Sequence, residues 1–98
     1  MPLKLIRYRA RPEKAQENQR LVEGVFAELH AKAPPHSRYL VLRLADGTFC
    51  HLVDDDARVV PNLDAFAAFR RGGEERRLDE PLALDATVVG NYRMLGEP

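Results

Sequence analysis

The residue best suited to acid–base chemistry in this sequence is His51, which lies within an apolar stretch. An imidazole titrates near neutral pH, so His51 could serve as a base or as a hydrogen-bond donor in a pocket. The structural alternative is a core histidine bonded to a backbone or hydroxyl group. The adjacent Cys50 suggests a nucleophile–base pair, but neighbouring residues of a strand point to opposite sides of a sheet. We therefore expect Cys50 on the face of the sheet that His51 does not occupy.

Four other residues are candidates for binding a ligand. His30 lies at the edge of the apolar stripe of a helix, where it could face the same pocket as His51 or face solvent. Tyr8, Asn91 and Tyr92 lie in segments that we expect to form neighbouring strands, where they could reach the pocket or a subunit interface. His51 is the catalytic candidate, and these four are the ligand-binding candidates.

The acidic residues and histidines do not form a metal-binding pattern. The carboxylates of residues 54–56 are consecutive, so they cannot all converge on one cation. No carboxylate at metal-ligand spacing joins His30 and His51. The sequence predicts no metal and no cofactor.

Two segments that would support these residues are clear. Residues 3–10 are rich in strand-forming residues and predict a first strand. Pro12 suits the first position of a helix, and Pro34-Pro35 ends one, so the sequence predicts a long helix between them. The apolar face of that helix consists of residues at spacings of three and four, namely Ala15, Asn18, Val22, Val25, Phe26, Leu29 and Ala33.

A hairpin follows, centred on Asp46-Gly47, which is typical of a two-residue type I′ turn. The flanking strands are predicted at residues 39–45 and 48–54. A two-residue loop sets the register and places six residues on the face under the helices: Leu40, Leu42, Leu44, Phe49, His51 and Val53. The opposite face then carries Tyr39, Val41, Arg43, Cys50, Leu52 and Asp54.

The remaining segments predict a second helix and a last strand. Pro61 or Asn62 begins the helix and Gly72-Gly73 ends it, with another helical turn at residues 74–78. Residues 86–95 predict the last strand. The resulting order β-α-β-β-α-β is that of a ferredoxin-like α+β fold, a single domain over residues 1–98 with two helices on one face of a four-stranded antiparallel sheet. The other face is apolar enough to predict a homodimer.

Composition excludes several classes of function. The chain has 15 basic residues (lysine plus arginine) and 15 acidic residues (aspartate plus glutamate). It therefore lacks the basic excess of a nucleic-acid binder. No apolar run approaches the roughly 18 residues that a membrane span requires. The single cysteine and the lack of a signal-peptide pattern favour a cytoplasmic location. We expect a partner in a second copy of the chain, and none in nucleic acid or membrane.

The sequence resembles the dimeric α/β-barrel superfamily, in particular the branch of antibiotic biosynthesis monooxygenases. The resemblance rests on three segments, Ile6-Arg7-Tyr8-Arg9-Ala10-Arg11-Pro12-Glu13-Lys14, Asn62-Leu63-Asp64-Ala65-Phe66-Ala67-Ala68-Phe69 and Val89-Gly90-Asn91-Tyr92-Arg93. It implies two sheets packed face to face, with a pocket between the sheet and the helices of each subunit. Enzymes of this branch often place a tryptophan in that pocket, and this sequence has none.

Two functions are compatible with the sequence. The resemblance implies a homodimer that binds a small apolar or aromatic molecule, with cofactor-independent oxygenation or isomerisation as its activity if it is an enzyme. The alternative is a non-catalytic dimerisation module whose cavity is filled by its own side chains.

Overall fold

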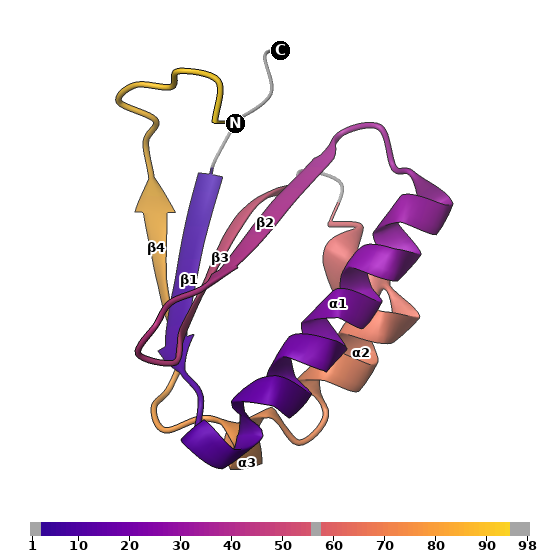
Figure 1. Cartoon of the computed structure of the whole chain (residues 1–98). Coiled ribbons are helices and arrows are strands. Elements are labelled where there is room, and N and C mark those ends of the chain that lie inside the picture. Colours follow the sequence, from indigo (N-terminus) through magenta and orange to yellow (C-terminus); the bar gives the residue numbers. More distant parts are fainter. Residues whose placement is uncertain (1–2, 56–57, 95–98) are drawn as a thin grey trace.

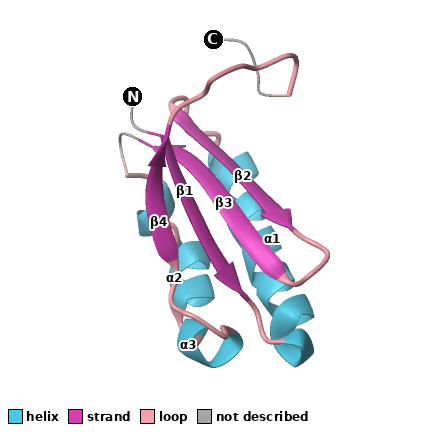
Figure 2. Cartoon of the chain, turned by 90° about the vertical axis from the view of Figure 1, so that its left-hand side faces the viewer, coloured by secondary structure: helices cyan, strands magenta, loops and turns pink. Residues whose placement is uncertain are grey.

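The computed structural model describes residues 3–55 and 58–94 as a four-stranded sheet with its helices on one side (Figures 1 and 2). The strands are β1 (Leu3–Arg9), β2 (Ser37–Arg43), β3 (Thr48–Asp55) and β4 (Leu82–Ala86). The helices are α1 (Ala15–Lys32), α2 (Asp64–Arg70) and α3 (Gly73–Arg76). The strands lie in the order β2-β3-β1-β4, and every neighbouring pair is antiparallel. The predicted ferredoxin-like α+β fold is confirmed.

Helix α1 forms as its residue pattern predicts. A 3₁₀ turn at Pro12–Lys14 leads into it, and its buried residues Ala15, Asn18, Val22 and Val25 recur at spacings of three and four. The helix ends where Ala33 adopts a left-handed conformation, with φ of 45°, and its N–H donates to the carbonyl of Leu29. Pro34 follows directly and cannot continue the helix.

The hairpin turn differs from the prediction. The N–H of Gly47 donates to the carbonyl of Leu44, and Gly47 has a φ of 90°. This is a three-residue loop, a type I turn followed by a left-handed glycine, instead of a type I′ turn. The Asp46 side chain accepts a hydrogen bond from the N–H of Thr48, which stabilises this alternative.

The longer loop moves the β2 register by one residue, which exchanges the two faces of that strand. Val41 pairs with His51 and Tyr39 with Val53, so the odd-numbered residues of β2 lie under the helices. Leu40 and Leu42 pair with Leu52 and Cys50 on the outer face. The predicted facing of β2 is therefore wrong. That of β3 agrees with the structure, with His51 on the helix side and Cys50 on the other.

The last strand also lies elsewhere than predicted. Strand β4 is Leu82–Ala86, immediately after Pro81, whereas residues 87–94 form no strand and position 95 lies outside the described residues. Strand β4 pairs over its whole length with the first five residues of β1, from Leu3 opposite Ala86 to Arg7 opposite Leu82. Proline is tolerated just before an edge strand, so Pro81 begins this strand instead of separating it from the sheet.

The outer face of the sheet, opposite the helices, is apolar across all four strands. Leu40 and Leu42 of β2 and Leu82 and Leu84 of β4 are exposed on it, and Leu5 and Leu52 lie between them. None of the helices in the described part of the chain is long and apolar enough to cross a membrane.

Candidate functional site

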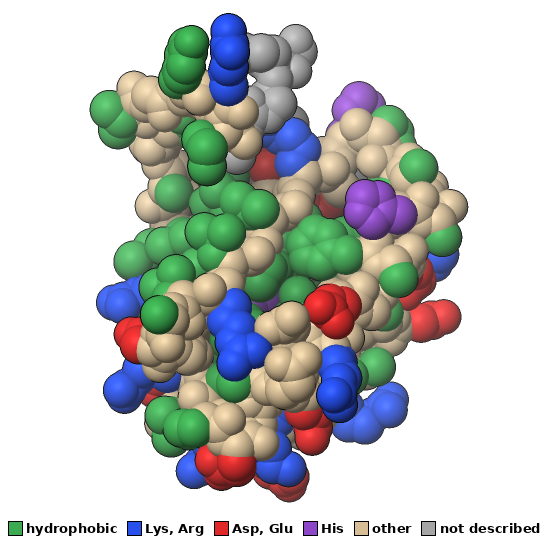
Figure 3. All heavy atoms as spheres, viewed as in Figure 1, with side chains coloured by type: hydrophobic (Ala, Val, Ile, Leu, Met, Phe, Trp, Pro, Cys, Tyr) green, Lys and Arg blue, Asp and Glu red, His purple; other side chains and the backbone are tan. Residues whose placement is uncertain are grey.

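A cavity of about 1050 Å³ lies between the inner face of the sheet and the α2–α3 region. Its apolar walls are formed by Ile6 of β1, Val53 of β3, and Phe66 and Phe69 of α2. In Figure 3, hydrophobic side chains gather between the β1–β4 side of the molecule and the helices. This volume is at the upper end of the range for small-molecule pockets.

His51 lies in the cavity wall, only 4% exposed, with both ring nitrogens hydrogen-bonded. Its Nε2 lies 2.9 Å from the hydroxyl of Tyr8, and its Nδ1 lies 2.6 Å from the hydroxyl of Tyr39. These three side chains come from adjacent strands, β1, β3 and β2, and the register brings them to the same face. The ring of His51 also contacts that of Phe69, at 5.7 Å between centroids.

The hydrogen-bonded chain continues from Tyr8 into the helical layer. The Asn18 amide of α1 donates to the hydroxyl of Tyr8 at 2.9 Å, and the Nε of Arg76 donates to Oδ1 of Asn18 at 3.2 Å. Arg76 also donates to the carbonyls of Arg71 and Phe69. The buried-residue chain (Arg76, Asn18, Tyr8, His51 and Tyr39) thus connects α3, α1 and three strands.

The donors of this chain all point in one direction. Arg76 can only donate, so it fixes Oδ1 of Asn18 toward itself and the amide NH₂ toward Tyr8. Among the described residues, Tyr8 has one acceptor left for its own hydrogen, Nε2 of His51. His51 then carries its proton on Nδ1 and donates to Tyr39, whose hydrogen is free for an acceptor in the cavity.

Burial keeps the histidine and the two tyrosines of this chain neutral. It lowers the pKa of His51 to about 4 and raises the pKa of Tyr8 to about 12, against smaller lowering effects of Asn18, Arg76 and Arg77. Burial also raises the pKa of Tyr39. At neutral pH, His51 is thus an uncharged imidazole between two protonated phenols, which is the arrangement needed to orient a hydroxyl donor.

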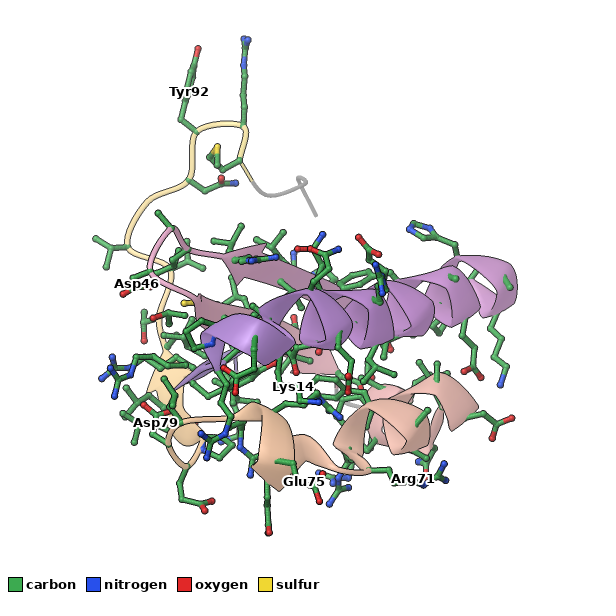
Figure 4. The ribbon with its side chains drawn as sticks, turned by 60° about the horizontal axis from the view of Figure 1, so that its bottom comes forward. Lys14, Asp46, Arg71, Glu75, Asp79 and Tyr92 are labelled. Atoms are coloured by element: carbon green, nitrogen blue, oxygen red, sulfur yellow. The ribbon has the colours of Figure 1, made fainter. Side chains whose placement is uncertain are left out.

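The other predicted site residues do not join His51 and Tyr8. His30 is exposed on α1 and borders a separate hollow of about 260 Å³, near Phe26 and Tyr39. Asn91 and Tyr92 follow β4 instead of lying in a strand, and they are not part of the cavity wall. Tyr92 is 80% exposed and points away from the sheet (Figure 4). These positions follow from where β4 ends, since a strand over residues 86–95 would have placed both residues beside β1.

Sequence reasoning missed three members of the chain. Tyr39 was expected on the outer face, because the assumed turn reversed β2. Asn18 was recognised only as part of the apolar stripe of α1, although an amide at the centre of such a stripe requires a buried hydrogen-bond partner. Arg76 carried no local signal, because only the tertiary structure brings it to Asn18.

In the described part of the chain, no group of three or more histidine, cysteine, aspartate or glutamate side chains could hold a metal ion.

The fold is shared with solved structures of other proteins. No protein-family profile matches the sequence, and no curated protein matches it. Solved structures of antibiotic biosynthesis monooxygenase-like proteins share its fold. One is a Nitrosomonas europaea protein named for antibiotic biosynthesis monooxygenases. It has a TM-score of 0.74 and 11% sequence identity, and the alignment covers 92% of this chain and 100% of the other.

Two further structures with the same grouping by name are similar. One from Caulobacter crescentus has a TM-score of 0.72 and 18% identity, covering 91% of this chain and 90% of its own. One from Bacteroides thetaiotaomicron has a TM-score of 0.73 and 14% identity, covering 97% and 95%. At these identities the similarity shows the fold. The predicted resemblance to the monooxygenase-like branch is confirmed at that level.

Proposed function

We propose that this chain forms a homodimer whose subunits each bind a small apolar or aromatic molecule in the cavity between sheet and helices. The observation that carries the proposal is that the buried-residue chain ends at Tyr39, whose hydroxyl lies 2.6 Å from Nδ1 of His51 and whose side chain lines the cavity of about 1050 Å³. A ligand with an oxygen atom near Tyr39 would accept this hydrogen bond. Its aromatic body would contact Phe66 and Phe69.

The proposed chemistry is stabilisation of negative charge on that ligand oxygen. A phenol or enol that loses a proton gains charge on its oxygen, and a preorganised hydroxyl donor stabilises that charge. This step is common to isomerisation and to oxygenation by dioxygen without a bound cofactor. His51 would act as a positioning residue, because both its nitrogens are occupied and it reaches the ligand only through Tyr39.

The homodimer is proposed from the outer face of the sheet. Four exposed leucines of β2 and β4 lie there beside partly buried Leu5 and Leu52. Monomeric proteins rarely leave such a continuous apolar surface in water. A second copy of the same sheet would cover it symmetrically.

The alternative, a non-catalytic module with a filled cavity, is less well supported. None of the described side chains fills the cavity, and its wall carries a polar chain that a structural core does not require.

A matched pair of ligands tests the proposal. We expect 1-naphthol to raise the melting temperature more than naphthalene does, because only 1-naphthol can accept from Tyr39. Tyr39→Phe should weaken 1-naphthol binding about 3- to 10-fold, the range for one hydrogen bond. His51→Ala should weaken it similarly while native mass spectrometry still reports two chains.

Tyr92→Phe is the matched control, because it removes a hydroxyl from an exposed tyrosine outside the cavity. It should bind both compounds as the unmodified protein does. The proposed function fails if neither compound changes the melting temperature, or if Tyr39→Phe and Tyr92→Phe behave alike.

A further inference from the structure

Two arginines meet at one end of the cavity, where α3 joins the sheet. Arg76 is 4% exposed, and its three recorded hydrogen bonds go to neutral oxygens of Asn18, Arg71 and Phe69. The Arg76 guanidinium also lies over the ring of Phe69, 5.6 Å from its centroid. Its positive charge is thus held in a fixed position with no carboxylate partner among residues 3–55 and 58–94.

Arg77, the next residue, has fewer hydrogen-bond partners than Arg76. Its side chain is 20% exposed, and its Nε is buried with no hydrogen-bond partner in the described part of the chain. Its recorded ion-pair partner is Glu80, which is 88% exposed and lies 3.9 Å away. An ion pair with so exposed a partner and so long a distance contributes little to the free energy of folding.

Both guanidinium groups converge beside Gly73. A Cβ at that position would lie 2.7 Å from Nη1 of Arg77 and 3.8 Å from Nη2 of Arg76. The absence of a side chain at Gly73 therefore leaves the space that Arg77 occupies. Two like charges in close proximity repel, and burial without a counter-ion adds a desolvation cost.

Apart from the exposed Glu80, the described acidic residues that line the cavity have no ion pair with either arginine. Asp55 accepts hydrogen bonds from Ser37 and from the N–H groups of Val59 and Val60. Glu74 and Glu75 are exposed and have no recorded ion pair with either arginine. At this end of the cavity, Arg76 thus has no carboxylate partner among the described residues and Arg77 has only the exposed Glu80, while the neighbouring walls are apolar and aromatic.

We propose that the ligand of this cavity is an aromatic or aliphatic acid whose carboxylate binds Arg77 and whose apolar body contacts Phe66 and Phe69. This proposal rests on the proposed function, because it specifies the ligand class of the same cavity. A guanidinium binds carboxylate through paired N–H donors, and the terminal N–H groups of Arg77, whose side chain lines the cavity, can supply them. Arg76 would add positive charge nearby without direct contact, since its side chain is only 4% exposed.

Matched acids and amides test the charge of the ligand. Isothermal titration calorimetry at low salt would compare 2-naphthoate with 2-naphthamide, and biphenyl-4-carboxylate with its primary amide. Each pair shares its apolar body and differs in charge. We expect at least one acid to bind the unmodified protein ten-fold or more tightly than its amide.

Two variants test the residue. Arg77→Gln should remove the advantage of the acid and leave the amide affinity unchanged. Gly73→Ala keeps both charges but displaces the Arg77 guanidinium, so it should also weaken acid binding, and it decides the question if Arg77→Gln fails to fold. Arg20→Gln, an exposed arginine of α1 outside the cavity, is the control for net charge and should bind both compounds normally.

The outcomes separate the two proposals. If the amides bind but the acids have no advantage, or if the advantage survives in both Arg77→Gln and Gly73→Ala, the acid proposal is overturned and the apolar cavity stands. If no acid or amide binds at millimolar concentration, both proposals are overturned.

Discussion

The two faces of this sheet differ in which residues distinguish them. The inner face, covered by helices, carries Tyr8, Tyr39 and His51, which are joined by hydrogen bonds. No helix covers the outer face (Figure 2). It carries leucines on each of the four strands. An ordinary two-layer domain would bury its leucines under the helices and expose its polar residues.

The difference suits the two faces to different roles. The inner face forms a cavity with an oriented hydroxyl, so its side chains are selected for hydrogen-bond geometry. The outer face has no such geometry, and burial of aliphatic area is what its residues can contribute. Under the proposed function, ligand recognition and the association of two copies would lie on opposite sides of the same four strands.

The largest effect is expected on the outer face. Leu42→Asp places a charge on the β2 side of the proposed interface, where burial without a partner costs several kcal/mol. We expect the dissociation constant of the dimer to rise at least 100-fold, as measured by sedimentation velocity.

Leu78→Asp is the matched control for this change. Leu78 is 47% exposed against 50% for Leu42, but it lies outside the strands, so the dimer should persist. A chain that sediments as a monomer before any substitution, at tens of micromolar, would contradict the proposed role of the outer face.

On the inner face, the low pKa of His51 predicts a pH-dependent stability. His51 is neutral in both states above the ordinary value of 6.5, and its pKa in the folded protein is about 4. As pH falls from 6.5 toward 4, the unfolded chain binds a proton that the folded protein does not, so the free energy of unfolding decreases. The loss approaches about 3 kcal/mol.

Guanidinium denaturation at pH 7.5 and pH 4.5 measures this loss. His51→Gln cannot titrate, so most of the difference between the two pH values should disappear in that variant. An equal loss in both proteins would show that other groups cause the pH dependence.

A smaller effect is expected from cutting the buried-residue chain at its centre. Asn18→Ala leaves Nε of Arg76 and the hydroxyl of Tyr8 each with one partner fewer in the core. We expect a loss of about 2 kcal/mol in the free energy of unfolding, measured by chemical denaturation. Gln16→Ala, an exposed amide of the same helix, should change it by less than about 0.5 kcal/mol; similar losses in both variants would contradict the special role of Asn18.

The sequence predicted the site in part, and strand β2 shows why. In β3, Phe49, His51 and Val53 alternate with Cys50 and Leu52, and their facing was predicted as observed. In β2, the leucines at alternate positions formed the more apolar set and were expected inside. The loop at residues 45–47 decided otherwise, because one additional residue reverses the whole strand.

The C-terminal segment shows a second limit. Val88, Val89 and Tyr92 have strand-forming side chains, so residues 86–95 predicted a strand. Pairing depends instead on what lies opposite, and β1 is matched by Leu82–Ala86. Local propensity predicted a strand at residues 86–95, several residues C-terminal to the observed β4 at Leu82–Ala86.

The sequence by itself determined the long helix, the hairpin and the order of elements, because periodicity, proline and glycine act within a few residues of one another. It also determined that His51 faces the helices. Only the tertiary structure decided that His51 meets Tyr39, that Asn18 links Tyr8 to Arg76, and that Arg77 enters the cavity beside Gly73. These contacts join residues from five separate elements, and their geometry depends on strand register and helix docking, which no local pattern encodes.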